Sequence, residues 1–326
     1  MENLKVNKLK INKLKTNELN KAKINKLSKV NINKTYKSKI KNNKEKVRSK
    51  AKYTGLYFVL PSLIGVAVFT LLPFLDVFLR SFQSAISREF VGIENYIEVF
   101  NNSAFKLAAS NTTKFVIVCI PLLLSLSLII AVALNKFVES SKILRTAFLI
   151  PMAVPIASIV LIWNIVFHEQ GFLSSVLDKF NIVGQDWMST GWAFWILVFS
   201  YIWKNLGYNI ILWLAGLNSI SKEIYESAKV DGASDFQCFT KITIPCLKPT
   251  LYTISVLSLL NSFKVFREAY LVAGDYPDKS MYLLQHLFNN WFRELDFNKM
   301  AAGSVLMAVI IFALIMLLQR AWEKQD

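Results

Sequence analysis

Cysteine and histidine are scarce in this sequence, which has three cysteines (Cys119, Cys238 and Cys246) and two histidines in 326 residues. No two cysteines form a C-x-x-C pair, so the sequence offers neither a disulfide framework nor the ligand spacing of a zinc site. His168 and His286 have no plausible serine or cysteine partner for nucleophilic catalysis. We therefore expect no metal site and no catalytic residues, and the chain is predicted not to be an enzyme.

A phosphate-binding loop is also missing. None of the 11 glycines is followed by lysine, so the sequence contains no G-K-[ST] motif. That motif places backbone N–H groups and a lysine around the phosphates of ATP. The chain is therefore not expected to bind ATP in this way or to need a cofactor of its own, and any ATP that drives it would be bound by partner subunits.

Acidic residues are too few to balance the 38 lysines and arginines, and the net charge is +16. The excess is confined to residues 1–52, which hold 18 of the basic residues and only three acids. A nucleic-acid-binding groove would spread positive charge over a folded surface, so no nucleic-acid partner is expected. A Lys/Asn-rich segment of this kind cannot bury enough apolar surface to fold. It is predicted to be a disordered cytoplasmic tail that contacts anionic lipid headgroups.

Apolar residues are abundant, at 54% of the sequence, and they occur in long runs. About 20 helical residues cross a bilayer. Six runs qualify and predict an all-α membrane domain over residues 53–326: Tyr57–Leu79, Phe115–Leu134, Ala147–Phe167, Trp192–Leu214, Leu251–Ala273 and Met300–Leu318. Pro151 and Pro155 predict a kink in the third. Four tryptophans near the predicted interfaces are expected to be anchors: Trp163, Trp187, Trp192 and Trp291.

The loops between these runs differ in positive charge. The tail, the 135–146 loop, the 215–250 loop and the C-terminal segment together hold 27 lysines and arginines, whereas the alternating segments hold ten. Cytoplasmic loops are the richer ones in Lys and Arg. Both termini and the long 215–250 loop are therefore predicted to lie in the cytoplasm.

The 215–250 loop has the pattern of two short helices joined by a turn. Asp231-Gly232 is a turn dipeptide that follows a run of helix-forming residues. Phe236, Phe239 and Thr243 have the spacing i, i+3, i+7, so we expect two aromatic side chains on one side of the second helix. Pro245 and Pro249 are expected to end that helix, and such a pair of helices with exposed phenylalanines suits the groove of a partner protein.

This loop resembles the cytoplasmic loop of binding-protein-dependent importer permeases. Their pattern is E-A-A, three residues, G, nine residues, I-x-L-P, and this chain has Glu226-Ser227-Ala228, then Gly232, then Ile242-Thr243-Ile244-Pro245. It departs at Ser227, at Ile244 and at Ser221, where carbohydrate members often have proline. The resemblance extends over residues 55–322, including RTAFLIPMAVPIASIVLIWNIVF, FVGIENYIEVF and SFKVFREAYLVAG.

The resemblance implies a MetI-like helical fold and a bacterial ATP-driven importer for sugars or related carbohydrates. It implies four kinds of neighbour: a second permease subunit, two cytoplasmic ATP-binding-cassette ATPases, an extracytoplasmic solute-binding protein and membrane lipids. The residues expected to couple this chain to the ATPase are Glu226, Ala228, Asp231, Gly232, Phe236, Phe239, Ile242 and Pro245. Glu226 is expected to hold the first helix of the loop, by a cap or an ion pair.

Polar residues inside the predicted spans indicate where a solute could pass, because an intramembrane charge is costly unless it faces a cavity or a partner. The candidates are Lys204, Asn205, Asn209, Lys264 and Arg267. A structural role for Lys204 remains an equal alternative, with a local helix break suggested by Gly207. Lys264 and Glu268 are four residues apart and could neutralise each other.

A secondary transporter belongs to a different class of function. A secondary transporter with its own ion coupling would favour inverted repeats with broken helices in corresponding positions. The sequence shows no such pairing, and this alternative leaves the 215–250 loop unexplained. A membrane-tethered nucleic-acid-binding protein is a third alternative, and deleting residues 1–52 would abolish its binding while an importer would keep most of its transport.

Overall fold

The computed structural model describes residues 57–85, 87–136 and 141–323. The predicted tail, residues 1–52, and part of the predicted 135–146 loop lie outside the described residues. The chain divides into two units, residues 1–75 and 76–326, which are taken separately here. The described residues are helical apart from loops and one isolated bridge between Gln83 and Phe90. This agrees with the expected all-α membrane fold.

The described part of the first unit is the apolar helix that begins at Tyr57. It carries no charged residue before Asp76, and a π-helical turn, η1 (Ala67–Leu71), interrupts it. The helix continues as α2 (Leu72–Arg80) into the second unit. Its end carries an ion pair, in which Arg80 Nε lies 2.6 Å from Asp76 Oδ2. A complete Tyr57–Arg80 helix is long and apolar enough to cross a membrane.

The first helices of the second unit include the longest in the chain. After α3 (Glu94–Asn101), α4 (Ser103–Lys136) runs for 34 residues with Pro121 inside it, so it begins well before the predicted start at Phe115. The predicted third span is broken into α5 (Ser141–Ala153) and α6 (Ile156–Phe167). The break follows Pro151 and includes Pro155, which confirms the kink that the two prolines predict. The short α7 (Phe172–Asp178) and η2 (Trp187–Ser189) follow.

The fourth predicted span is α8 (Ala193–Asn218), an unbroken helix of 26 residues. The helix break suggested by Gly207 is therefore wrong. A Cβ atom at this position would collide with the backbone carbonyl of Phe148 on α5. Glycine is required here because the two helices approach each other closely, and not because the chain bends.

The rest of the chain is a series of shorter helices and one long one. The loop contains α9 (Lys222–Val230), α10 (Asp235–Cys238), the π-helical η3 (Phe239–Thr243) and α11 (Ile244–Cys246). The fifth span is α12 (Lys248–Ser262), the 3₁₀ turn η4 (Phe263–Val265) and α13 (Phe266–Ala273). Finally, α14 (Leu284–Arg293) precedes α15 (Phe297–Glu323).

The number of spans agrees with the prediction only in part. Four described helices are long and apolar enough to cross a membrane: Tyr57–Arg80, Ser103–Asn135, Ile156–Asp178 and Phe297–Arg320. A fifth is added if Asp235–Cys246 and Lys248–Ala273, bent by 61°, form one broken span. The remaining helix, α8, is long enough, but Lys204, Asn205 and Asn209 reduce its apolar character. A total of six spans is consistent with these helices, and this number stays a prediction.

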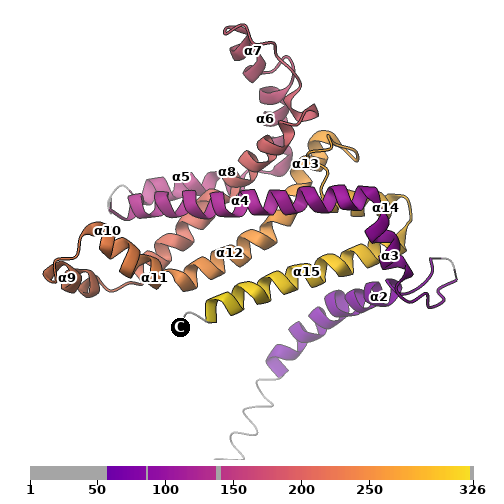
Figure 1. The fold of residues 1–326 in the computed structure, drawn as a ribbon, viewed down its shortest axis with the longest axis horizontal. Coiled ribbons are helices and arrows are strands. Elements are labelled where there is room, and N and C mark those ends of the chain that lie inside the picture. Colours follow the sequence, from indigo (N-terminus) through magenta and orange to yellow (C-terminus); the bar gives the residue numbers. More distant parts are fainter. Residues whose placement is uncertain (1–56, 86, 137–140, 324–326) are drawn as a thin grey trace, which may run out of the picture. The chain divides into compact units, whose positions relative to one another are not determined.

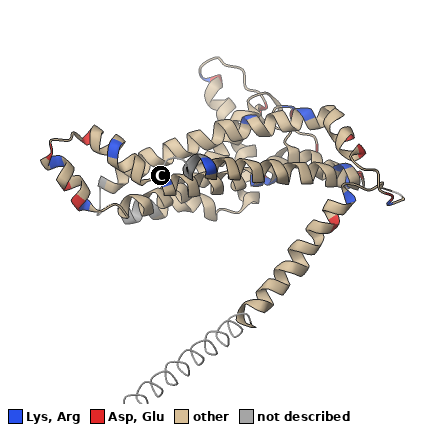
Figure 2. Cartoon of the chain, turned by 60° about the horizontal axis from the view of Figure 1, so that its bottom comes forward, with Lys and Arg blue, Asp and Glu red and all other residues tan. Residues whose placement is uncertain are grey.

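In the second unit, α8 is the helix with the most buried side chains and packs on α4, α5 and α12 (Figure 1). Polar bonds fix it as well: Trp213 Nε1 donates to Ser127 Oγ on α4 at 3.0 Å, and the Tyr201 hydroxyl donates to the Ser258 carbonyl on α12 at 2.6 Å. Charged residues gather in the short helices and at helix ends, while the long helices are almost without them (Figure 2). Trp163 and Trp291, each 4% exposed, are core residues and not the predicted anchors.

Candidate functional site

The first candidate site is the helical loop, residues 221–247. Its first helix, α9, begins at Ser221, whose hydroxyl accepts a bond from the Glu223 N–H at 3.3 Å. The helix ends in a Schellman motif: the N–H of Ala233 bonds to the Ala228 carbonyl at 2.9 Å, and that of Gly232 to the Lys229 carbonyl at 3.1 Å. Gly232 has φ of +81°, the left-handed conformation that this motif requires.

The second helix of the loop starts with a capping box. The Ser234 N–H donates to Gln237 Oε1 at 2.8 Å, and the Gln237 N–H donates to the Ser234 hydroxyl at 3.3 Å. The helix then runs through η3 to Cys246. The prediction that Pro245 and Pro249 end it is wrong, because Pro249 lies in the first turn of α12 and Pro245 lies within the helix, one residue before its end. Proline is tolerated there because it lies in the first turn of α11, after the π-helical turn, where its missing N–H costs nothing.

Two side-chain contacts join the halves of the helical loop. The Tyr225 hydroxyl on α9 and the Thr243 hydroxyl on η3 are 2.8 Å apart, and Thr243 is 6% exposed. Lys229 Nζ lies 3.8 Å from Asp235 Oδ1 across the turn, an exposed pair that contributes little. A cavity of about 430 Å³ lies between the loop and the ends of α4 and α8, with Phe239 in its lining. The two halves of the loop are thus held together across the turn, but the cavity separates the loop from the ends of α4 and α8.

The expected coupling residues differ in exposure. Glu226, Asp231, Gly232, Phe236 and Pro245 are exposed, whereas Ala228, Phe239 and Ile242 are partly buried. Phe236 is 74% exposed, and Phe239 instead faces the cavity beneath the loop. The prediction that both phenylalanines stand on one open face is therefore wrong for Phe239, which lies on the side of the helix that faces the cavity and the ends of α4 and α8.

Glu226 also differs from expectation. Within the described residues it has neither a hydrogen bond nor an ion pair, so it does not hold α9 in the way predicted. Ser221 caps that helix instead. Two exposed apolar residues that sequence reasoning missed lie on the same helix, Ile224 at 46% and Val230 at 88% exposure. Their position beside the Asp231-Gly232 turn was visible in the sequence, but their exposure was not.

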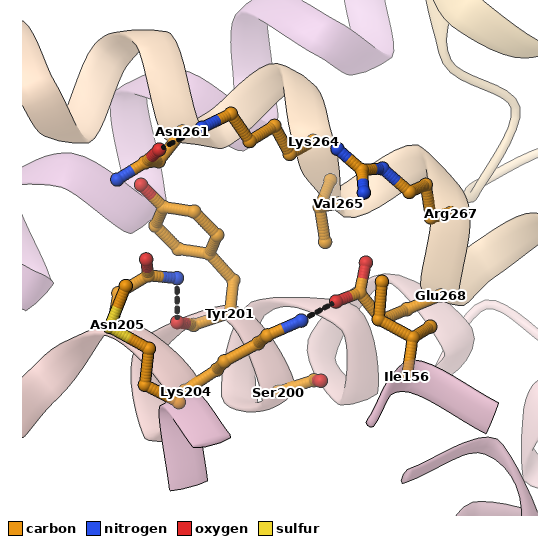
Figure 3. A pocket seen from close by; sticks show the side chains of 11 residues that line it. Ile156, Ser200, Tyr201, Lys204, Asn205, Asn261, Lys264, Val265, Arg267 and Glu268 are labelled. Carbon is orange, nitrogen blue, oxygen red and sulfur yellow. Dashed lines mark hydrogen bonds and ion pairs between the residues drawn. The ribbon is translucent and has the colours of Figure 1, made fainter. Parts of the chain in front are cut away.

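The second candidate site is a polar cavity of about 160 Å³ between α8, the α5–α6 break and the α12–α13 segment. Its lining comprises Met152, Ile156, Ser200, Tyr201, Lys204, Asn205, Asn261, Lys264, Val265, Arg267 and Glu268. Figure 3 shows that Lys264 and Arg267 come from one side of it and Lys204 from the other. Four of the five predicted pathway residues therefore meet at one place.

Within the cavity, Lys204 Nζ on α8 forms an ion pair with Glu268 Oε1 on α13 (Figure 3). The Glu268 side chain is 5% exposed and that of Lys204 is 21% exposed. The predicted pair between Lys264 and Glu268 does not form. Lys264 Nζ donates instead to Asn261 Oδ1 at 2.9 Å, because the 3₁₀ turn η4 shifts the register between Lys264 and Glu268 away from that of an α-helix.

The two asparagines of α8 have separate positions. Asn205 lines the cavity and donates to the Tyr201 carbonyl at 2.8 Å. Asn209 is 2% exposed, lies outside the cavity lining and donates to Ser258 Oγ at 3.1 Å, so it joins α8 to α12. Sequence reasoning missed Ser200, whose hydroxyl is buried without a hydrogen-bond partner among the described residues. Its i, i+4 spacing to Lys204 was the available signal.

The segment before α15, residues 274–296, is predicted to lie on the outer side and is called the outer hairpin. Asn111 on α4 donates to the carbonyls of Lys279 and Tyr282, at 2.6 and 3.0 Å. Asp275 pairs with Arg293, which lowers the pKa of that carboxyl group. His286 is fully buried, and desolvation lowers its pKa from 6.5 to about 4. The ring is therefore neutral near pH 7, and no group of three metal-ligating side chains occurs within the described part of the chain.

Comparison with known proteins places this geometry in a family. Residues 123–324 match the model of the binding-protein-dependent transport system inner membrane component. The trehalose/maltose transport system permease protein MalF of Thermococcus litoralis is 30% identical over 275 residues, covering 81% of this chain and 93% of the relative. The arabinooligosaccharides transport system permease protein AraP of Bacillus subtilis is 31% identical over 268 residues, covering 79% and 84%.

The fold agrees with these relatives. A chain from the bacterial alginate ABC transporter, solved in complex with an alginate pentasaccharide-bound periplasmic protein, aligns with a TM-score of 0.72. The alignment covers 82% of this chain and 93% of the other, at 21% sequence identity. A family match over more than half of the chain, supported by relatives of nearly its full length, settles the assignment. The chain belongs to the family of binding-protein-dependent transport system inner membrane components.

Proposed function

We propose that this chain forms one half of the translocation pathway of an ATP-driven importer for a sugar or related carbohydrate. A second permease subunit, of a different sequence, would supply the other half. Two cytoplasmic ATPase subunits would bind the ATP, and an extracytoplasmic protein would deliver the solute. The carbohydrate class rests on the names of the relatives, whose solutes include trehalose, maltose and arabinooligosaccharides.

The observation that carries the ATPase partner is the exposed apolar surface of the helical loop. Besides Ile244, which is 42% exposed, the loop exposes three large apolar side chains: Ile224 at 46%, Val230 at 88% and Phe236 at 74%. Covering a side chain such as Phe or Val stabilises a contact by about 1.5–3 kcal/mol. A groove on the ATPase that receives these three residues would hold the loop, with Glu226 available for a polar contact at its edge.

The helical loop has the stiffness that a mechanical link needs. The Schellman motif fixes the end of α9, the capping box fixes the start of α10, and the bond between Tyr225 and Thr243 joins the two helices. When the ATPase pair closes on ATP, a docked and braced loop moves as one piece. A single residue separates α11 from α12. The movement of the loop would therefore be transmitted along α12 to Arg267 and Glu268 in the polar cavity.

Two valines give a matched test of the ATPase contact. Val230 and Val183 are 88% and 87% exposed, and Val183 lies in the predicted outer loop between α7 and η2. We expect Val230→Ser combined with Phe236→Ala to reduce co-purification of the ATPase by tenfold or more, because about 3 kcal/mol of apolar contact is removed. Val183→Ser should change nothing. Equal retention of the ATPase by both variants would remove the loop from the mechanism.

The orientation has its own test. The excess of lysine and arginine predicts that both termini and the helical loop lie in the cytoplasm. In a background without native cysteines, a membrane-impermeant thiol reagent applied outside should modify Val183→Cys and spare Ser234→Cys. Modification of Ser234→Cys in sealed cells would contradict the orientation and the ATPase contact together.

A further inference from the structure

The charges around the polar cavity are not balanced. Its lining contains three cationic side chains, Lys204, Lys264 and Arg267, and in the described part of the chain Glu268 is its single carboxylate. The ion pair of Glu268 is with Lys204. Lys264 and Arg267 are therefore left with positive charge that no side chain in the lining offsets.

Neither of these two cations has another counter-charge nearby. Lys264 donates to Asn261 Oδ1, which is a neutral group. Arg267 forms no hydrogen bond or ion pair with any described residue. The six predicted spans contain only two acids, Asp76 and Glu268. Asp76 lies beside Arg80, near the end of the first span, and pairs with it.

Lys264 and Arg267 are exposed in the described chain. A cation within a predicted span marks a pathway for a solute or an ion by default. A guanidinium group offers a planar set of donors that matches carboxylate or phosphate oxygens, and the ammonium group of lysine adds a second positive point charge. Around them the cavity offers the Ser200 hydroxyl, which has no partner in the described structure, and the amide of Asn205. These neutral polar groups suit sugar hydroxyls.

We infer that the solute that passes this cavity is an anionic carbohydrate, one that carries a carboxylate, sulfonate or phosphate group. This inference rests on the proposed function, because it takes the cavity as part of the translocation pathway. Arg267 and Lys264 would meet the anionic group. Lys204 and Glu268 would stay paired with each other without binding the solute, and their ion pair would fix the distance between α8 and α13.

The local charge can be measured without knowing the solute. In the purified importer, with Cys119, Cys238 and Cys246 replaced by alanine, Asn205→Cys places a thiol in the cavity. Its modification is followed with two methanethiosulfonate reagents, an anionic sulfonatoethyl and a cationic trimethylammonioethyl form. The ratio of the two rates cancels any effect on the reactivity of the thiol itself. We expect the anionic reagent to react faster, because a cavity of one sign concentrates ions of the other.

Neutralising the two cations should change that ratio. The double variant Arg267→Gln, Lys264→Gln is expected to lower the anionic-to-cationic ratio on the order of tenfold. The matched control is Lys279→Gln, a lysine of the outer hairpin outside the cavity lining, which should leave the ratio unchanged. A ratio that the double variant leaves unchanged would overturn the inference, because the second permease subunit would then already neutralise both cations.

A second measurement uses a pair of sugars that differ in charge. Digalacturonate should protect the Asn205→Cys thiol from the cationic reagent at concentrations where neutral galactobiose does not, and Arg267→Gln should abolish this protection. Equal protection by the two sugars would overturn the inference and leave the importer assignment intact. Failure of the proposed function is seen separately, as equal retention of the ATPase by the Val230→Ser, Phe236→Ala variant and by the Val183→Ser control.

Discussion

Removing either member of the Lys204–Glu268 ion pair should cost more than removing both. Lys204→Met leaves a carboxylate whose side chain is 5% exposed, and whose Oε2 atom already lacks a partner among the described residues. Glu268→Gln leaves a lysine whose side chain is 21% exposed and can turn into the cavity. The stranded carboxylate is therefore the more costly of the two.

The magnitudes follow from this difference in burial. A single charge left alone after loss of a buried partner destabilises a protein by about 3–5 kcal/mol. We assign about 3 kcal/mol to Lys204→Met and about 1–2 kcal/mol to Glu268→Gln, because Lys204 keeps some access to solvent. The double variant removes both charges together and is expected to lie within about 1 kcal/mol of the unaltered chain. The coupling energy between the two positions is then about 3–5 kcal/mol.

The assay is thermal unfolding of the detergent-solubilised importer, with ATP-dependent uptake measured on the same four proteins. A loss of about 3 kcal/mol corresponds to about 6–12 °C in a unit of this size. Lys204→Met should show that loss, and adding Glu268→Gln should restore most of it. If the two single losses instead add in the double variant, the residues do not act as a buried pair. Uptake that stays low after stability is restored would show that Lys204 also contacts the solute.

Three further changes have expected outcomes. Gly207→Ala should destabilise the second unit by about 1–3 kcal/mol, because the added Cβ atom collides with the Phe148 carbonyl. Gly191→Ala is the control: no atom lies within 4 Å of the added Cβ, so the melting temperature should not change. Gly232→Val should abolish uptake while membrane insertion stays normal. Gly232→Asn should retain most of the uptake, because asparagine tolerates φ of +81°. An equal loss of uptake in both variants would refute the conformational explanation. His286→Gln should flatten the decline in melting temperature below pH 6.5. The pKa of this histidine falls from 6.5 to about 4 on folding, so between these two pH values only the unfolded chain binds a proton at this residue. As the pH is lowered from 6.5 to about 4, the free energy of unfolding therefore decreases by about 3 kcal/mol. Identical pH profiles for the two proteins would contradict this.

The sequence predicted the parts of the fold that follow from local chemistry. Apolar runs marked the helices, two prolines marked the break between α5 and α6, and Gly232 marked the end of α9. Each of these depends on a few neighbouring residues and on rules that hold in any protein. The spacing of the motif in the helical loop has a structural reason as well, because Ala228 and Gly232 both take part in the Schellman motif.

The errors occurred where distant segments meet. Gly207 looked like a helix break because the backbone of Phe148, on another helix, cannot be seen from the sequence. Glu268 was assigned to Lys264, four residues away, when its partner is Lys204 on another helix. Phe239 faces a cavity lined by residues of α4 and α8, and those helices are distant in the sequence. Local spacing therefore identified the charged residues of the cavity but not how they pair.

The way the outer hairpin is attached bears on how freely it can change in evolution. Asn111 holds it through the carbonyl groups of Lys279 and Tyr282, and the Thr112 hydroxyl accepts from the N–H of Leu284 at 3.0 Å. Main-chain groups are common to every amino acid except for the N–H that proline lacks. Exposed side chains of this hairpin, such as Tyr276, can therefore be exchanged without loosening it from α4. A lineage that acquires a new delivery protein could remodel this surface while its attachment stays constant.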